Sequence, residues 1–237
     1  MKSIILLLFL VCRLCLLAQP VRIHSHNDYR QPSPLQEALA CNVFSIEADI
    51  FLYQGQLRVA HDEAELPNAP SLDSLYIQPL LHWLNAIPQG VAVHFPYLLI
   101  DIKSNSAAVL PALSKMLEPY PHLFNPQRMQ VVISGERGNP KDWLNWPVYF
   151  LFDGRPDETY DMATLGRVAF ISDAYKSYSH PARKKIKSLA SAVHRSGKLL
   201  RLWGIPDHPG SWRKMKSWGV DIINTDQVRA CREYFKE

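Results

Sequence analysis

Short apolar runs recur along this sequence of 237 residues, and stretches with a helical spacing of apolar residues lie between them. Eight of these runs have the length of a strand and are rich in β-branched or aliphatic residues, which predicts eight β-strands. The predicted strands cover residues 21–26, 43–50, 97–102, 129–134, 147–152, 167–172, 198–203 and 220–224. The predicted helices cover residues 33–41, 71–86, 107–118, 139–145, 158–164, 181–196, 208–218 and 226–235.

Strands that alternate with helices are typical of a parallel α/β fold, and eight of them favour a single closed (β/α)₈ TIM barrel. Continuous apolar runs such as 97–100 fit strands that are buried on both faces. An open doubly wound sheet is the alternative, but no GxGxxG turn follows the first strand to suggest a dinucleotide site. The chain length also lies near the roughly 250 residues of a typical barrel.

One segment departs from this alternation. Residues 56–62 form a second extended run soon after the strand at 43–50, and a short stretch that includes Gly55 joins the two. This pattern predicts a small hairpin-like excursion after strand 2. The excursion would carry His61 back over the mouth of the barrel.

The first eighteen residues differ from the rest of the chain. A positively charged start precedes an apolar run at 4–10, and Arg13 interrupts the apolar stretch. We interpret residues 1–18 as a secretory signal peptide and residues 19–237 as the barrel domain, which predicts export to the periplasm or the extracellular space. A membrane anchor is the alternative, but the run is shorter than the about 20 residues that span a bilayer. The cleavage position stays open, because Leu16 is large for a site that prefers small residues.

The charge balance argues against a nucleic-acid partner. The full chain has 26 Lys and Arg against 22 Asp and Glu, a net charge of +4. Removal of residues 1–18 leaves 24 basic and 22 acidic residues, and a net charge of +2 is too weak to suggest binding to nucleic acid. The basic stretch at 183–187 fits the solvated face of a helix, since Ile186 and Val193 follow the helical spacing of a core face.

Two cysteines, Cys41 and Cys231, would remain after cleavage, and neither has a metal-binding spacing. The first and last helices of a closed barrel are neighbours, so a disulfide between these residues is one interpretation in an oxidising compartment. Two separate buried thiols are the other interpretation.

Each of the first three main strands ends with two ionisable residues that are two positions apart. Residues at this spacing point to the same face of a strand, and catalytic groups of barrels lie at the C-terminal ends of the strands. The three strands therefore bring two imidazoles, three carboxylates and one ammonium to one mouth. The pairs are His24 with His26, Glu47 with Asp49, and Asp101 with Lys103.

Three carboxylates repel one another in a partly buried site, so this cluster requires a cation. Oxygen ligands suit Mg²⁺ or Ca²⁺. A hard divalent cation beside histidines points to phosphate chemistry, in which the cation offsets charge on the phosphoryl oxygens while one His acts as a base and another as an acid.

Each of these residues taken alone also has a structural interpretation. A single strand-end His is more often a hydrogen-bonded structural residue, and a strand-end Asp often caps the next helix. Their joint arrangement favours a functional site. Asp28, in contrast, is expected to hold its own loop. The remaining histidines show no such pairing and are interpreted as surface or structural residues: His82, His94, His122, His180, His194 and His208.

Four segments follow one another in the order of a known enzyme family. They are HSHNDY at 24–29, the stretch 34–62, LLIDIKS at 98–104 and WGVDIINTD at 218–226. The chain resembles the glycerophosphodiester phosphodiesterases and the wider phosphatidylinositol-phospholipase-C-like barrels. It is most similar to the divergent branch that contains a yeast mitochondrial-inheritance protein and its bacterial relatives.

The resemblance implies a metal-dependent hydrolase that acts on a glycerol- or lipid-linked phosphodiester. Glu47, Asp49 and Asp101 would hold one divalent cation, Mg²⁺ or Ca²⁺. A first-strand His and His61 would form the acid–base pair, and Lys103 would contact a phosphate oxygen. Attack by water and attack by a neighbouring substrate hydroxyl, which would give a cyclic intermediate, are both open.

The resemblance also implies contacts with the substrate. Arg201 and Trp203 on the seventh strand would line the substrate cleft. The family usually has His-Arg-Gly at the first strand, where the Arg engages phosphate, but Asn27 is neutral here. Phosphate contact would then rely more on the metal and on Lys103.

Which first-strand histidine is catalytic stays open at this point. The local match of His-Asn to His-Arg favours His26. The spacing of His-x-x-Asn in a related branch favours His24.

Two other functions fit parts of the pattern. One is a non-catalytic barrel outside the cytoplasm that binds a phosphorylated ligand or a glycan. The absence of the first-strand Arg favours this function, and the complete set of three carboxylates argues against it. A glycoside hydrolase is disfavoured, because Glu47 and Asp49 would lie on the same side of a sugar, whereas glycosidase acids flank the bond. The expected partner is a small-molecule or lipid phosphodiester, with contact to a membrane surface left open, and we expect a monomer.

Overall fold

The computed structural model describes residues 20–88, 91–178 and 180–236. The predicted signal peptide at 1–18 lies outside these residues. Among the helices of the described ranges, none combines the length and the apolar character that crossing a bilayer would require.

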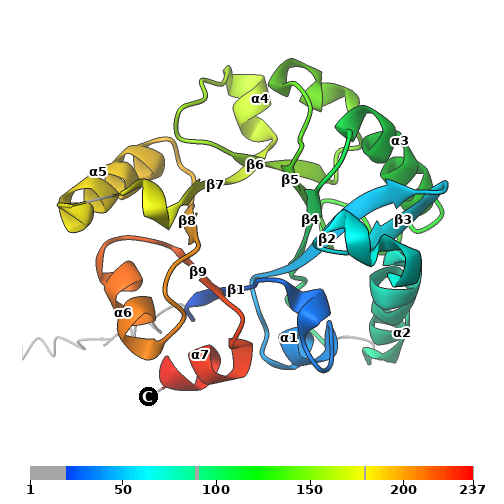
Figure 1. The fold of residues 1–237 in the computed structure, drawn as a ribbon, viewed down its shortest axis with the longest axis horizontal. Coiled ribbons are helices and arrows are strands. Elements are labelled where there is room, and N and C mark those ends of the chain that lie inside the picture. Colours follow the sequence, from blue (N-terminus) through cyan, green and yellow to red (C-terminus); the bar gives the residue numbers. More distant parts are fainter. Residues whose placement is uncertain (1–19, 89–90, 179, 237) are drawn as a thin grey trace, which may run out of the picture.

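Eight parallel strands close into a barrel, which confirms the (β/α)₈ prediction (Figure 1). Closure comes from β1, which pairs in parallel with β9 on one side and with β2 on the other. The ring runs in the order β1, β2, β4, β5, β6, β7, β8 and β9. These strands are β1 (Arg22–Ser25), β2 (Ser45–Tyr53), β4 (Tyr97–Ile102), β5 (Val131–Gly135), β6 (Phe150–Gly154), β7 (Val168–Ala174), β8 (Leu200–Trp203) and β9 (Ile222–Thr225).

Helices surround the strands, as Figure 1 shows. The α-helices are α1 (Gln36–Ala40), α2 (Gln78–Ala86), α3 (Ser106–Leu117), α4 (Met162–Gly166), α5 (Ala182–Arg195), α6 (Pro209–Ser217) and α7 (Val228–Tyr234). A π-helical turn at Asp73–Ile77 leads into α2. Short 3₁₀ turns lie at Asp28–Arg30, Glu63–Asn68, Pro140–Asn145 and Tyr175–Ser177.

Three predicted helices differ from the observed ones. The segment predicted at 139–145 forms a 3₁₀ helix, and the helix predicted at 158–164 begins later, because Asp161 caps it by accepting a hydrogen bond of 2.7 Å from the backbone N–H of Thr164. The helix predicted at 33–41 is shortened to α1. Its start is delayed because the backbone N–H of Leu35, whose φ is 65°, donates to a side chain in the preceding loop.

The predicted excursion is confirmed as β3 (Gln56–Val59), which pairs antiparallel with the end of β2. Beyond β3, the backbone N–H of Ala60 donates to the carbonyl of Asp49 at 3.1 Å. The chain therefore returns along β2 and places His61 beside Asp49.

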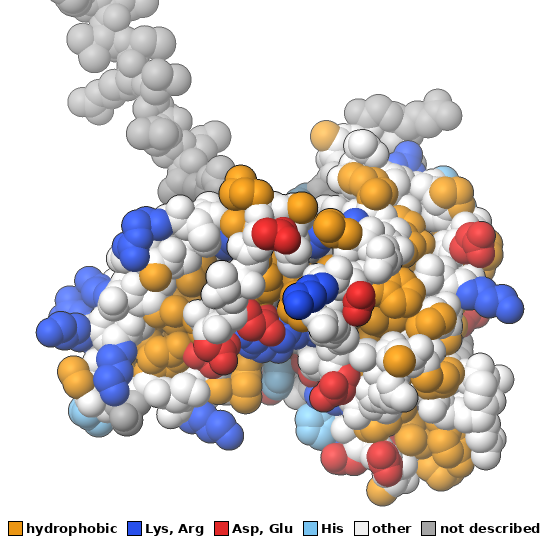
Figure 2. All heavy atoms as spheres, turned by 90° about the horizontal axis from the view of Figure 1, so that it is seen from above, with side chains coloured by type: hydrophobic (Ala, Val, Ile, Leu, Met, Phe, Trp, Pro, Cys, Tyr) orange, Lys and Arg blue, Asp and Glu red, His pale blue; other side chains and the backbone are white. Residues whose placement is uncertain are grey.

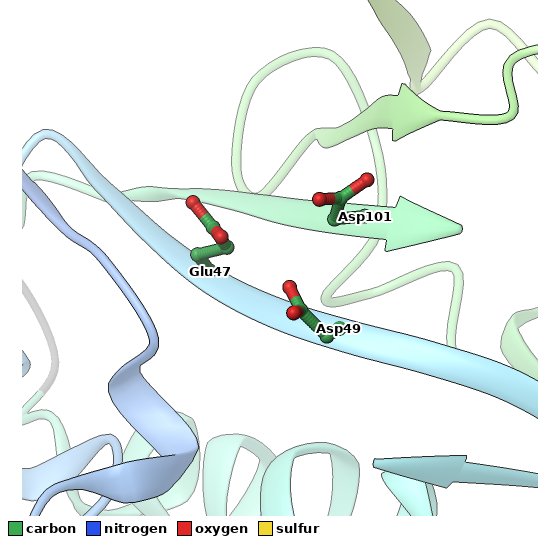
Figure 3. Close-up of side chains that lie close together, drawn as sticks. All are labelled: Glu47, Asp49 and Asp101. Carbon is green, nitrogen blue, oxygen red and sulfur yellow. The ribbon is translucent and has the colours of Figure 1, made fainter. Parts of the chain in front are cut away.

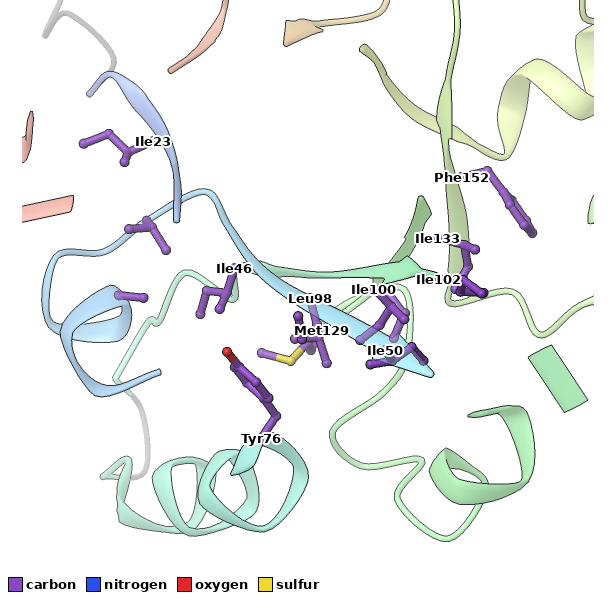
Figure 4. Close-up of a cluster of buried hydrophobic side chains, with 14 of the residues drawn as sticks. Ile23, Ile46, Ile50, Tyr76, Leu98, Ile100, Ile102, Met129, Ile133 and Phe152 are labelled. Atoms are coloured by element: carbon purple, nitrogen blue, oxygen red, sulfur yellow. The ribbon is translucent and has the colours of Figure 1, made fainter. Parts of the chain in front are cut away.

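The hydrophobic core of the described residues has one large part and two small parts. The large part fills the space between the strands and the helices, and Figure 4 shows side chains such as Ile46, Ile100 and Tyr76 in it. One small part includes Phe51 and Leu66. The other lies inside the barrel, where Leu99, Val132, Phe170 and Ile222 form a buried plug. Because residues two positions apart on a strand point to the same face, the residues two positions after this plug also point into the barrel. They lie above the plug, so polar side chains can occupy these positions.

Cys41 and Cys231 are both buried and free in the structure, which agrees with the interpretation of two separate thiols. The basic stretch at 183–187 lies on α5, with Ile186 in the core and its Lys and Arg side chains exposed. In Figure 2, Lys and Arg side chains gather at the left edge, the side on which α5 and α6 lie in Figure 1.

Candidate active site

A polar layer lies directly above the apolar plug, towards the C-terminal ends of the strands. On neighbouring strands the inward position changes from apolar to polar two residues later, as from Leu99 to Asp101 on β4 and from Val132 to Ser134 on β5. A pocket of about 330 Å³ opens at this layer. It is lined by His26, Asn27, Glu47, His61, Asp101, Lys103, Ser134, Gly135, Arg155, Arg201 and Trp203.

The structure brings the three predicted carboxylates together. Glu47 and Asp49 come from β2 and Asp101 from the neighbouring β4, and Figure 3 shows them on the same side of the sheet. One oxygen from each lies within 4.8 Å of the others. The Oδ1 atoms of Asp49 and Asp101 are buried and have no hydrogen-bond partner among the described residues. Convergent oxygens without donors fit a hard divalent cation.

The electrostatics of the cluster show its need for positive charge. Burial, together with the neighbouring negative charges, raises the pKa of Asp101 to about 6 and also raises the pKa of Asp49. Burial would raise the pKa of Glu47 as well, but a hydrogen bond from His24 and nearby positive charges lower it. Each carboxylate therefore depends on cationic neighbours to stay ionised.

Lys103 supplies part of that charge. Its Nζ lies 2.8 Å from Asp101 Oδ2 and 2.9 Å from Asp49 Oδ2. Burial lowers the pKa of Lys103, but the two carboxylates outweigh this effect and raise it. Its ammonium group is thus held charged at the edge of the acidic cluster.

A glycine makes room for Asp101. A Cβ atom at Gly135 would lie 2.1 Å from Asp101 Oδ1, and the φ of Gly135 is +66°. Only glycine combines this conformation with such a close approach.

The two histidines of the first strand lie at different depths. His24 is fully buried, with Nε2 2.5 Å from Glu47 Oε2 and Nδ1 2.7 Å from Ser45 Oγ. Burial and the charge of Arg201 lower the pKa of His24 to about 4. His24 therefore lies beneath the pocket as a neutral, hydrogen-bonded group.

His26 lines the pocket, and its side chain is 31% exposed. Its Nδ1 lies 2.7 Å from Asp226 Oδ1, and its Nε2 lies 4.0 Å from Glu47 Oε1. Burial lowers the pKa of His26, but the hydrogen bond to Asp226 and the two negative charges outweigh it and raise the pKa. An imidazole in this setting can exchange protons with a ligand in the pocket.

His61 lies on the other side of the acidic cluster. Its Nδ1 lies 2.9 Å from Asp49 Oδ2, and its backbone N–H donates to Glu65 Oε2 at 2.8 Å. The hydroxyl of Tyr29 also donates to Asp49 Oδ2, at 2.9 Å. The cluster is therefore flanked by two imidazoles, His26 and His61, each oriented by a carboxylate.

The other predicted contacts also gather here. Asn27 has a left-handed backbone with φ 45°, and its side chain lies between His26 and Tyr29. Arg201 is nearly buried, whereas Trp203 is 39% exposed at the pocket rim. Of the ten residues predicted for the site, eight line the pocket, and the other two, His24 and Asp49, lie just beneath it.

Asp28 holds its own loop, as the sequence predicts. It is buried and accepts hydrogen bonds from Ser25 Oγ, from the backbone N–H of Leu35 and from the hydroxyl of Tyr76. This network positions the turn that carries the first-strand residues to the mouth.

Three charged residues of the site were not identified from the sequence. Asp153 lies near the end of β6, Arg155 directly follows β6, and Asp226 directly follows β9. The signal was available: Asp153 is two positions after Leu151, as Asp101 is after Leu99, but a single acid at a strand end also fits a helix cap. Arg155 lies beyond the strand, where alternation no longer applies.

Comparisons of the sequence and of the structure connect this fold and site to known proteins. Residues 14–95 match the model of the AIM6-like phosphodiesterase domain family. This stretch contains both first-strand histidines and continues past His61, but it ends before Asp101. The chain is also similar to an altered inheritance of mitochondria protein 6 homolog from Arthroderma benhamiae, at 26% identity over 91% of this chain and 84% of the relative.

Solved structures show the same barrel. A glycerophosphodiester phosphodiesterase from Parabacteroides distasonis has a TM-score of 0.63 and 15% identity, over 91% of this chain and 96% of that one. A Ca²⁺-dependent phosphatidylinositol-specific phospholipase C from Streptomyces antibioticus has a TM-score of 0.56 and 12% identity, over 92% and 96%. The resemblance to phosphodiesterase barrels is thereby confirmed, and at these identities the structures establish the fold.

Proposed function

We propose that this pocket hydrolyses a phosphodiester linked to glycerol or to a lipid, with Mg²⁺ or Ca²⁺ held by Glu47, Asp49 and Asp101. The observation that carries the proposal is the acidic cluster, which has unpartnered buried oxygens and lies next to the imidazole of His61 at Asp49 and that of His26 near Glu47. When bound, such a cation would offset negative charge on the phosphoryl oxygens. The names of the two structural neighbours, a glycerophosphodiester phosphodiesterase and a Ca²⁺-dependent phospholipase C, support this substrate class.

The two imidazoles suit the proton transfers of this reaction. An attacking hydroxyl, from water or from the substrate, forms a new bond to phosphorus and gives its proton to one imidazole. The bond from phosphorus to the leaving oxygen breaks, and that oxygen takes a proton from the other imidazole. Among the two first-strand histidines, exposure to the pocket favours His26 for this role, and the contact with Asp226 would orient it.

Hydrolysis of a panel of phosphodiesters tests the proposal. The panel contains bis(4-nitrophenyl) phosphate, glycerophosphocholine, glycerophosphoglycerol and phosphatidylinositol, each measured with EDTA and after adding back Mg²⁺ or Ca²⁺. We expect cleavage that EDTA abolishes and that one of the two cations restores. Cleavage that persists in EDTA would contradict the proposed role of the acidic cluster.

Variants connect the activity to the site. His61→Ala and Glu47→Ala should each abolish hydrolysis in a protein that remains folded, whereas the exposed His122→Ala should have no effect. Undiminished turnover in either site variant would contradict the mechanism. Tight binding of phosphate esters without any turnover would instead identify a non-catalytic binding barrel.

A further inference from the structure

Three cationic side chains line the pocket among the described residues: Lys103, Arg155 and Arg201. They differ in how much hydrogen-bonding capacity each has left for a ligand. A phosphodiester carries negative charge on two non-bridging oxygens, which a guanidinium can contact with two parallel N–H groups.

Arg201 has little capacity left. It is 4% exposed, and each of its nitrogens has a protein neighbour. Nε donates to Ser172 Oγ at 2.9 Å, Nη2 donates to Asp153 Oδ2 at 3.2 Å, and Nη1 lies 2.8 Å from His24 Nε2. Arg201 therefore supports the floor of the pocket.

Lys103 is also engaged, because its ammonium lies between Asp49 and Asp101 at hydrogen-bond distance from both. Any contact of Lys103 with phosphate competes with these carboxylates.

Arg155 is different. Only its Nη1 is engaged: it lies 2.9 Å from Asp153 Oδ2 and donates to the carbonyls of Asp153 and Gly154, each at 3.1 Å. Its Nε and Nη2 have no partner among the residues that the structure describes, and the side chain is 25% exposed where it lines the pocket. One part of the guanidinium is anchored, and the rest has N–H groups available.

The loop that carries Arg155 is itself held in place. The backbone N–H of Arg155 donates to the hydroxyl of Tyr160 at 3.0 Å, and that hydroxyl donates to Glu158. Arg137 pairs with Glu158 through two hydrogen bonds and also donates to the carbonyl of Asp153 at 2.7 Å. An anchored side chain loses little conformational entropy when it binds a ligand.

On the opposite wall, the turn after the first strand also carries a guanidinium, but Arg30 pairs with Glu65 at 2.9 Å and is not among the residues that line the pocket. Asn27 is neutral there, and its side-chain amide contacts His26 and accepts from Tyr29. We propose that Arg155 is the guanidinium that contacts the non-bridging oxygens of the phosphodiester through Nε and Nη2. This role rests on the proposed function, because it assigns a further contact to the same substrate.

The test compares Arg155→Gln and Arg155→Lys with Lys176→Gln. Lys176 is an exposed lysine in the turn after β7, at the same end of the barrel, and it does not line the pocket. Binding of inorganic phosphate to the full-length protein in Mg²⁺ is measured by calorimetry, and turnover is measured with bis(4-nitrophenyl) phosphate. Calorimetric titration of Mg²⁺ alone and thermal unfolding serve as readouts of the acidic cluster and of the fold.

We expect Arg155→Gln to weaken phosphate binding by roughly 10- to 100-fold and to lower kcat/KM by a similar factor, which is typical for loss of a charge-assisted hydrogen bond. Arg155→Lys should recover only part of this loss, because an ammonium cannot make two parallel contacts. Lys176→Gln should change neither quantity, and Mg²⁺ affinity should be the same in all variants.

Unchanged phosphate affinity in Arg155→Gln, or a loss that Lys176→Gln shares, would overturn the assignment. A parallel loss of Mg²⁺ affinity would also overturn it, since Arg155 would then act through the acidic cluster. If phosphate binding depends on Arg155 but no diester is cleaved, this assignment stands and the hydrolase proposal fails.

Discussion

Two uncharged residues, Gly135 and Tyr29, lie directly against the carboxylates of the acidic cluster. Gly135 leaves the space into which Asp101 Oδ1 extends, and Tyr29 donates to the oxygen of Asp49 that His61 and Lys103 also approach. The distance between the carboxylates thus depends on residues that would not themselves bind a cation.

We predict that Gly135→Ala disrupts this site. The new Cβ would overlap Asp101, and alanine at φ +66° adds about 1–2 kcal/mol of backbone strain. Calorimetric titration should show at least a roughly tenfold loss of Mg²⁺ affinity. A loss of about 1.4 kcal/mol of binding free energy, caused by a displaced Asp101 carboxylate, is enough for that change. Gly197→Ala is the matched control, because Gly197 has φ +71° with open space around it. If both variants keep the same cation affinity, the close approach at Gly135 does not matter.

The two first-strand histidines should separate activity from stability. His26→Gln should abolish turnover and leave the unfolding midpoint unchanged, because its ring is at the pocket surface. His24→Gln should lower the free energy of unfolding by about 1–3 kcal/mol, since Glu47 and Ser45 lose a buried partner. Turnover assays and urea denaturation of both variants, with the exposed His82→Gln as control, check this. Full turnover in His26→Gln would return the catalytic role to His24.

At the scale of elements, side-chain hydrogen bonds fix the loop after β6 at the mouth of the barrel. The loop after β6 is held to the loop after β5 by Glu158, which accepts two hydrogen bonds from Arg137. Burial would raise the pKa of Glu158, but its hydrogen bonds with Arg137 and Tyr160 outweigh this and lower it. A lowered pKa in the folded protein means that the ionised form stabilises the fold.

Glu158→Gln should therefore destabilise the protein in a pH-dependent way. The contribution of Glu158 is fully present above the usual Glu pKa of 4.5 and is lost as the pH falls through the lower folded value. We expect a loss of about 1 kcal/mol at pH 7, discounted for partial exposure, and a smaller difference at pH 3.5. Urea denaturation at both pH values measures it. Glu37→Gln, which removes an ion pair with the exposed Arg229, should change stability less at pH 7. A difference between wild type and Glu158→Gln that does not shrink in acid would contradict this account.

At the scale of the whole molecule, closure of the barrel depends on contacts between the two ends of the described chain. β1 pairs with β9, and Arg232 on α7 donates to three carbonyls near the start of the chain. These carbonyls belong to Val21, Cys41 and Asn42, at distances of 2.8 to 3.0 Å.

Arg232→Met should lower the free energy of unfolding, because it weakens the contact that closes the barrel, and it should leave the activity of the pocket unchanged. Three carbonyls would lose their donor, which corresponds to about 2–3 kcal/mol of unfolding free energy. Arg229→Met is the matched control on the same helix, because Arg229 is exposed and pairs there with the side chain of Glu37. Urea denaturation followed by tryptophan fluorescence measures the loss, and kcat for a cleaved phosphodiester should be unchanged in both. Equal stability of the two variants would show that this contact is not needed for closure.

The sequence by itself determined the barrel and the position of the acidic cluster. Apolar runs separated by helical spacing are local patterns, and they predict strands and helices because side chains alternate along a strand. The same alternation places Glu47, Asp49 and Asp101 on the inner face, whatever the exact length of the loops. Helix limits were less predictable, as α4 shows, because its start depends on the hydrogen bond between Asp161 and Thr164.

Only the tertiary structure decided which groups face the pocket and which lie beneath it. His24 and His26 are the same residue type and point to the same face of the first strand. They differ in depth along the barrel axis, so His24 is buried and His26 is partly exposed at the pocket. Asp153 and Arg155 come from the end of β6 and Asp226 from the end of β9, far along the chain from the first three main strands, so alternation within one strand cannot pair them with His26 or Glu47. The burial of His24 and the contact between His26 and Asp226 depend on the closed barrel, because they form only when β1 pairs with β9.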